Sequence, residues 1–231
     1  MTSIGSLDRF LEVQIEACRR QGEGARKGPV IAITREPGCE GESIAQTLAK
    51  EFGLVLYDWE IVEKIAKDAN VSEQVVATLD KKVRSELDEW LASFTGDSIL
   101  SSYHYMQSLG RVLFTVASNG NAVILGRGAN FLLPYEKRTL GLCLIAPLEE
   151  RVKNIMQTLL LSRENALEHI TRTEREQRLW IKKYGHADIK DATRYHMIIN
   201  TALVTVETIV QLVRQVPGIC PGAPGVLNKA G

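Results

Sequence analysis

The sequence predicts an α/β protein whose core is a parallel five-stranded sheet covered by helices on both faces. Two observations indicate this fold class. Strand-like runs alternate with segments in which apolar residues recur at helical spacing. The strand-like runs are apolar throughout, as is typical of parallel strands buried on both faces. With 231 residues, of which 45% are hydrophobic and 24% charged, the chain is long enough for one well-buried core.

Each element follows from a local pattern. The expected strands are residues 30–34, 54–57, 122–125, 139–146 and 195–200. The expected helices are residues 7–19, 42–52, 98–118, 147–161, 162–183 and 204–216, and the charged section over 59–91 also has helical spacing. Gly53 ends the second of these helices as a left-handed C-cap. Pro147 and two glutamates begin a later one, as the helix dipole favours.

Three regions are expected along the chain. An amphipathic helix and a polar linker occupy residues 1–27, one domain spans 28–217, and a disordered tail rich in proline and glycine covers 218–231. The apolar face of the N-terminal helix either covers an edge of the sheet or contacts a partner, such as a second copy of the chain. The sequence leaves both possibilities open.

Composition excludes several classes of function. The net formal charge is zero and the pI is about 6.9, so no overall field attracts nucleic acid or an anionic membrane. No apolar run approaches the roughly 20 residues that span a bilayer, and acidic residues near the start argue against a signal peptide. The four cysteines are scattered without a C-x-x-C pair, which argues against zinc or disulfides and favours the cytoplasm.

Residues 30–45 predict a phosphate-binding loop. A short apolar strand leads into a turn that contains Gly38 and Gly41, and a helical pattern follows. Backbone N–H groups at a helix start, together with the positive end of the helix dipole, attract an anion. The same strand, turn and helix also occur in α/β proteins that bind no nucleotide, so the loop alone leaves this interpretation open.

The loop matches the Walker pattern G-x-x-x-x-G-K-[ST] only in part. Gly41 and Ser43 occupy the second glycine and the Mg²⁺-binding hydroxyl, whereas Glu36 and Glu42 replace the first glycine and the lysine. A carboxylate in place of the ammonium repels phosphate oxygens. Arg35 and more distant arginines are candidates to restore positive charge. Within the turn, Cys39 is either a reactive thiol or, as we prefer, a small side chain that fills space.

Six blocks in order carry a resemblance over roughly residues 28–216. They read REPGCEGESIA, LYDWEIVEKIA, AVILGRGANFLL, APLEERV, TEREQRLWIKKYGH and DATRYHMIIN. This order resembles the cytidylate kinase-like family of P-loop phosphotransferases. The resemblance implies a five-stranded core, a monophosphate-binding region between about residues 58 and 118, and a lid around 164–184. It also implies transfer of the ATP γ-phosphoryl group to a nucleoside monophosphate with the help of Mg²⁺.

The resemblance implies roles on the donor side of the site. The backbone N–H groups of four loop residues would bind the donor phosphates: Gly38, Cys39, Gly41 and Glu42. Ser43 would hold Mg²⁺ directly or through water. Asp58 follows the second strand, where it either orients a ribose or a Mg²⁺-bound water, or simply caps the next helix.

The resemblance also implies an arginine set. Arg127 would bind the acceptor phosphate, and the lid region would contribute Arg151, Arg172, Arg175 and Arg178. Spacing of three places Arg175 and Arg178 on one side of a helix. The alternative is an ordinary solvated helix, in which Glu174 pairs with Arg178 and Arg172 with Glu176 at i,i+4.

The four histidines, including His169, are expected at surface or packing positions.

Two functions remain open from the sequence. The first is an ATP-dependent kinase that acts on a nucleoside monophosphate or a similar small acceptor. The second is a degenerate kinase-like protein that binds a nucleotide or a protein partner in a regulatory role. Three departures from the family pattern favour the second: Glu36, Glu42, and Gly128, where cytidylate kinases carry an acid. We expect the kinase.

Overall fold

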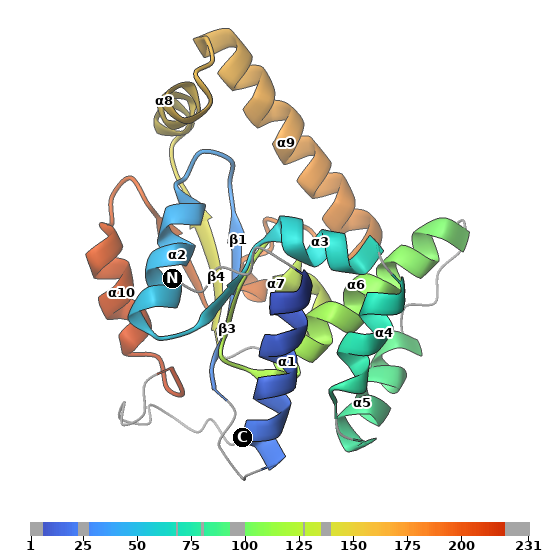
Figure 1. Ribbon diagram of the computed structural model, residues 1–231. Helices are drawn as coiled ribbons and strands as arrows, with labels where there is room; N and C mark the ends of the chain where they lie inside the picture. Colours follow the sequence, from blue (N-terminus) through green and yellow to red (C-terminus); the bar gives the residue numbers. More distant parts are fainter. Residues whose placement is uncertain are drawn as a thin grey trace.

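The computed structural model describes residues 7–22, 28–67, 69–79, 81–92, 100–126, 128–134 and 140–219 (Figure 1). Five strands form one sheet: β1 (Val30–Arg35), β2 (Val55–Tyr57), β3 (Ala122–Leu125), β4 (Leu140–Ile145) and β5 (Met197–Asn200). All neighbouring strands are parallel, in the order β2-β3-β1-β4-β5. The predicted fold class is confirmed, and the strand bounds differ from the expected ones by at most two residues at either end.

The helices connect the strands and cover both faces of the sheet (Figure 1). They are α1 (Leu7–Gly22), α2 (Gly41–Glu51), α3 (Trp59–Lys67), α4 (Ala69–Ala77), α5 (Lys81–Ala92), α6 (Leu100–Asn119), α7 (Ala129–Leu132), α8 (Leu148–Leu159), α9 (Arg163–Tyr184) and α10 (Val206–Arg214), with a 3₁₀ turn at Ala192–Arg194. The expected helical section over 59–91 is divided into α3, α4 and α5. Among the described helices, none is long and apolar enough to cross a bilayer.

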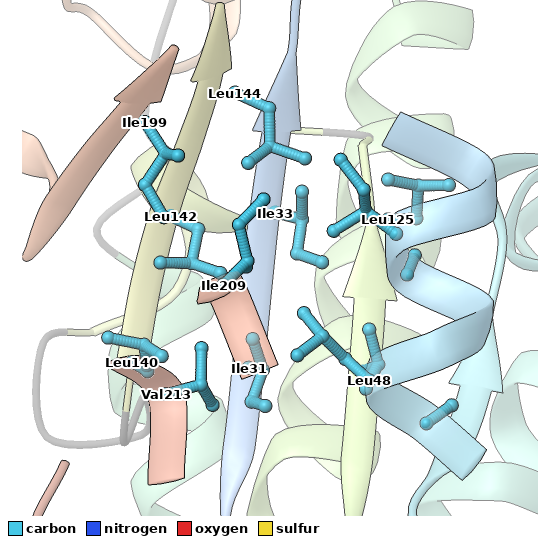
Figure 2. Packing of buried hydrophobic residues seen from close by; sticks show 14 of the residues in the cluster. Ile31, Ile33, Leu48, Leu125, Leu140, Leu142, Leu144, Ile199, Ile209 and Val213 are labelled. Carbon is cyan, nitrogen blue, oxygen red and sulfur yellow. The ribbon is translucent and has the colours of Figure 1, made fainter. Parts of the chain in front are cut away.

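Strand β1 shows why the strand runs are apolar throughout. Ile31 and Ile33 belong to a cluster with α2 and α10, which Figure 2 shows around Leu48 and Ile209. Ala32, between them, belongs to the opposite cluster, which also contains residues of α1, α3, α4, α6 and α7. Side chains that alternate between two buried faces must both be apolar.

The N-terminal helix α1 is part of the second cluster. Phe10 is fully buried and packs edge-to-face on Tyr57 of the edge strand β2, with ring centroids 5.6 Å apart. Gln14, 1% exposed, donates a hydrogen bond to the Tyr57 hydroxyl at 2.8 Å and accepts one from Asn119 at 2.7 Å. Burial raises the pKa of Tyr57, which keeps its hydroxyl protonated. The apolar face of α1 is therefore used within the chain itself.

The C-terminal end of the fold extends slightly past the expected domain boundary. Ile219, placed by the sequence in the disordered tail, is buried against the cluster of α2 and α10. The remaining tail, from residue 220, lies outside the described residues, as does most of the linker before β1.

Phe10→Ala is expected to lower the free energy of unfolding by about 3–5 kcal/mol, because it empties a fully buried aromatic site. Urea unfolding of the full chain, followed by circular dichroism, measures this change. Ile15→Ala on the same helix is the control: Ile15 is 44% exposed, so about 0.5 kcal/mol or less is expected. Equal, small effects of both substitutions would mean that α1 is not docked in solution.

Candidate functional site

The loop between β1 and α2 lies at the carboxyl end of the sheet and is held against α8. Gly38 has a φ of 85°, and a Cβ there would lie 2.5 Å from the backbone oxygen of Arg151, so only glycine fits. Asn154 of α8 donates a hydrogen bond from its side-chain amide to the Gly38 carbonyl at 2.8 Å. These contacts fix the path of the turn before α2 begins.

The start of α2 leaves backbone donors for an anion. Ile44 donates its N–H to the carbonyl of Glu40 at 3.1 Å, as an ordinary helical residue does. Among the described residues, none accepts a hydrogen bond from the backbone N–H of Glu42 or Ser43. These two N–H groups point out of the helix start with the positive end of the dipole, so the local geometry fits an anion such as phosphate.

Cys39 fills the inside of the turn. It is 1% exposed, its thiol donates to the Leu144 carbonyl at 3.5 Å, and its sulfur accepts the N–H of Gly41. Burial raises the pKa of the Cys39 thiol to about 12, so the thiol stays protonated and unreactive. Its backbone N–H faces the Glu36 carbonyl at 3.4 Å. The space-filling interpretation of Cys39 agrees with this structure.

Glu42 forms an ion pair with Arg35. The Arg35 Nη2 lies 3.0 Å from the Glu42 Oε1, and the exposed fractions of the two side chains are 16% and 68%. A Cβ on Gly41 would lie 2.5 Å from the Arg35 Cδ, so glycine lets the arginine pass over the start of α2. The positive charge of Arg35 is thus offset by the carboxylate that replaces the Walker lysine.

A second ion-pair cluster surrounds Arg151, which is 7% exposed. Its Nε donates to the Ala146 carbonyl at 2.9 Å and lies 3.4 Å from the Glu36 Oε2, while its Nη1 binds Glu174 of α9 at 2.5 Å. Glu36 also accepts the N–H of Ala146 at 3.2 Å. Glu36, in place of the first Walker glycine, therefore helps to anchor the loop and offsets a buried cation.

A pocket of about 540 Å³ opens beside the loop, between the ends of β1 and β3 and helix α9. The strand ends contribute Thr34, Arg35, Gly126 and Gly128. Helix α9 contributes His169, Thr173, Glu176, Gln177, Trp180 and Ile181, and Ile189 completes the lining. The Thr34 hydroxyl accepts a hydrogen bond from the side-chain amide of Asn130 at 3.1 Å, which fixes its position in the lining.

None of the α9 residues that line this pocket was predicted from the sequence to belong to the site. His169, Thr173, Glu176 and Trp180 recur every three or four residues, so they form one stripe on the helix. The same spacing can be found in the sequence, but the prediction for this segment was based on its arginines. His169, expected to be a surface or packing residue, lines the pocket from the far end of the stripe.

The expected lid arginines lie elsewhere on α9. Arg172, Arg175 and Arg178 are exposed, and none of them lines the pocket. At about 100° of rotation per residue, Arg175 and Arg178 lie on the side of the helix opposite the pocket stripe. Glu174 binds Arg151 and is not paired with Arg178, so this i,i+4 pair of the alternative interpretation does not form.

Three further expected site residues have different surroundings. Asp58 accepts the N–H of Glu60 at 3.1 Å and so caps the start of α3, which was one of its two expected roles. Ser43 is exposed at the first turn of α2. Arg127 lies outside the described residues, although its neighbours Gly126 and Gly128 both line the pocket.

Most of the chain is similar to known proteins. A model of the cytidylate kinase-like family matches residues 30–203. Relatives named cytidylate kinase from Ignicoccus hospitalis and Aeropyrum pernix are each 27% identical, over 191 residues (80% of this chain, 97% of the relative) and 185 residues (78% and 94%). The crystal structure of an uncharacterized protein from Eubacterium ventriosum has a similar fold, with a TM-score of 0.62, 20% identity and coverage of 82% and 97%.

Arg151→Met is expected to lower the free energy of unfolding by about 2–3 kcal/mol, because Glu36 and Glu174 lose their shared cation. Loss of one member of a fully buried pair costs about 3–5 kcal/mol, and the lower value follows because the two carboxylates are 33% and 29% exposed. Chemical denaturation measures the change.

The double variant Arg151→Met/Glu174→Gln is expected to recover part of this loss. Arg163→Met is the control: its pair with Glu149, at 2.8 Å, is exposed to solvent, so stability should not change. The same loss in both single variants would contradict a special role for the buried cation.

Proposed function

The chain belongs to the cytidylate kinase-like family, and from this premise we propose that it is an ATP-dependent phosphotransferase. The acceptor is a nucleoside monophosphate or a similar small phosphorylated molecule. The two relatives named cytidylate kinase support this class of reaction, since the match extends over nearly their whole length.

The observation that supports the proposal most directly is that the start of α2 and the pocket lie next to each other, at the end of strand β1. Thr34 and Arg35 end the strand that leads into the loop, and the same two residues line the pocket. A donor phosphate at the start of α2 and an acceptor in the pocket would therefore meet over one edge of the sheet. Such positioning supplies much of the rate in phosphoryl transfer.

Backbone donors are assigned to the ATP phosphates. The N–H groups of Glu42 and Ser43 would bind the phosphate oxygens, with Gly38 and Gly41 giving the loop its shape. Among the described residues no group of three or more acidic, cysteine or histidine side chains is placed to hold a metal. The Ser43 hydroxyl is exposed at the first turn of α2, where it would hold a Mg²⁺ whose other ligands are phosphate and water oxygens and which would neutralise phosphate charge.

The acceptor phosphate is assigned to Arg127, because the residues on either side of it line the pocket. Arg172, Arg175 and Arg178 contribute only if α9 rotates, since they are exposed and outside the pocket. Closure of a helical segment over bound substrates is a common step in enzymes that must exclude water. In this scheme the arginines stabilise charge on the transferred group after closure.

The ion pairs favour a second candidate function, nucleotide binding without transfer. Each described cation in contact with the loop has a carboxylate partner: Arg35 has Glu42, and Arg151 has Glu36 and Glu174. These pairs reduce the positive potential that a triphosphate requires. A protein that holds a nucleotide weakly and senses it would tolerate such a site.

Two experiments distinguish these functions. The first is calorimetry with ATP, with and without Mg²⁺, and the second is a phosphoryl-transfer screen over CMP, dCMP, UMP and AMP. Binding of ATP and transfer to at least one acceptor is the expected result. Binding without transfer to any acceptor would favour the second function. Absence of nucleotide binding would contradict both.

Glu42→Gln is expected to tighten ATP binding about fivefold, because it frees the charge of Arg35 near the phosphates. The factor corresponds to one unit charge at about 4 Å in water. Calorimetry at fixed ionic strength measures it.

Glu51→Gln is the matched control for this substitution. Glu51 pairs with Arg214 at 3.5 Å at the other end of the same helix. It lies roughly 13 Å along the helix from Glu42, which exceeds the screening length of about 8 Å. An equal change in both variants would indicate a general charge effect, and an unchanged affinity in Glu42→Gln would mean that Arg35 does not reach the phosphates.

A further inference from the structure

We propose that the pocket binds the flat aromatic ring of its ligand against the indole of Trp180, so that Trp180 selects acceptors that carry a nucleobase over sugar phosphates that lack one. This inference rests on the proposed function in taking the pocket as the acceptor site. It adds a specificity-determining residue that lies on α9, outside the loop.

Two neighbours, Tyr184 and Gly128, fix the position of the Trp180 indole. Its ring lies 5.2 Å from the ring of Tyr184, one helical turn further along α9, at an interplanar angle of 56°. The edge of its six-membered ring approaches the backbone of Gly128, where a Cβ would lie 2.6 Å from the Trp180 Cζ3 and 3.0 Å from the Ile181 Cδ1. Gly128 also has a φ of 65°, so its lack of a side chain serves both the turn and the indole.

Part of the indole remains available to a ligand. Trp180 is half-buried and belongs to the pocket lining. Within the described ranges, no side chain or carbonyl accepts a hydrogen bond from its indole N–H. A ligand in the pocket would therefore meet both an aromatic surface and an unused donor.

The rest of the lining suits a ring with a polar edge. Ile181 and Ile189 form apolar parts of the wall, while Thr34, Glu176 and Gln177 supply hydroxyl, carboxylate and amide groups. A nucleobase has apolar faces and a rim of donors and acceptors, so it matches both kinds of surface. The volume of about 540 Å³ lies within the range of small-ligand pockets. A sugar phosphate alone would leave the aromatic wall without a contact.

Trp180→Leu and Trp180→Phe test the proposal in the full chain, with CMP, AMP and ribose 5-phosphate as probes in calorimetric titrations. Loss of the aromatic surface in Trp180→Leu is expected to weaken binding of both nucleotides about tenfold to a hundredfold. Trp180→Phe keeps an aromatic ring and should remain within about threefold of the wild type. Ribose 5-phosphate should bind more weakly than CMP to the wild type and equally to all three proteins.

Fluorescence provides a second measurement that does not depend on the leucine variant being folded. CMP should quench tryptophan emission in the wild type and in Trp90→Phe, but not in Trp180→Phe. Trp90 is the matched control, because it stacks on Phe114 at 5.3 Å in a separate cluster that lies outside the pocket. Thermal unfolding of each variant confirms that it is folded.

Several results would overturn the proposal. Unchanged CMP affinity in folded Trp180→Leu, equal wild-type affinities for CMP and ribose 5-phosphate, or no binding of either nucleotide would each do so. The proposed function has a separate readout, because it requires ATP binding and phosphoryl transfer. Transfer to CMP with an unchanged KM in Trp180→Leu would reject only the role of Trp180. Trp180-dependent binding of CMP without any transfer would reject only the kinase.

Discussion

The guanidinium of Arg151, a residue with 7% exposure, joins the three parts of the candidate site. Arg151 contacts Glu36 in the loop, the carbonyl of Ala146 after β4, and Glu174 on α9. A buried cation is tolerated only where partners offset its lost hydration, so these contacts depend on one another. The width of the pocket follows from them, because α9 forms one wall and the end of β1, next to the loop, forms another.

The same constraint explains the two glutamates that depart from the Walker pattern. Glu36 is one partner of the buried cation, and Glu42 is the partner of Arg35. Where the Walker pattern has a lysine, this loop has two glutamates that are both engaged in ion pairs. The backbone N–H groups of Glu42 and Ser43 at the start of α2 are then its available donors. An anion there would rely on the backbone and the helix dipole more than on side-chain charge.

Much of the fold could be predicted because its signals are local. Ile31 and Ala32 point to opposite buried faces of the sheet, so the strand is apolar throughout. Gly53, with a φ of 64°, adopts the expected left-handed conformation just after the end of α2. Helix α7 has only four residues, too few for a periodic pattern. The site was harder because its pairs are not local. Local spacing paired Glu174 with Arg178, but the buried arginine 23 positions away is its actual partner.

Helix α9 presents two different faces, and only one can meet a ligand in a given arrangement. The stripe with Trp180 faces the pocket, Arg175 and Arg178 lie on the opposite side, and Glu174 lies between these faces, bound to Arg151. Rotation that brings the arginines inward would break this ion pair and leave Arg151 without one of its partners, which costs free energy because the cation is buried. Such a rotation is therefore favourable only when another anion replaces Glu174 beside Arg151. A phosphate group carries the charge and the acceptor oxygens to do so, so closure of α9 in the proposed kinase would depend on an occupied loop.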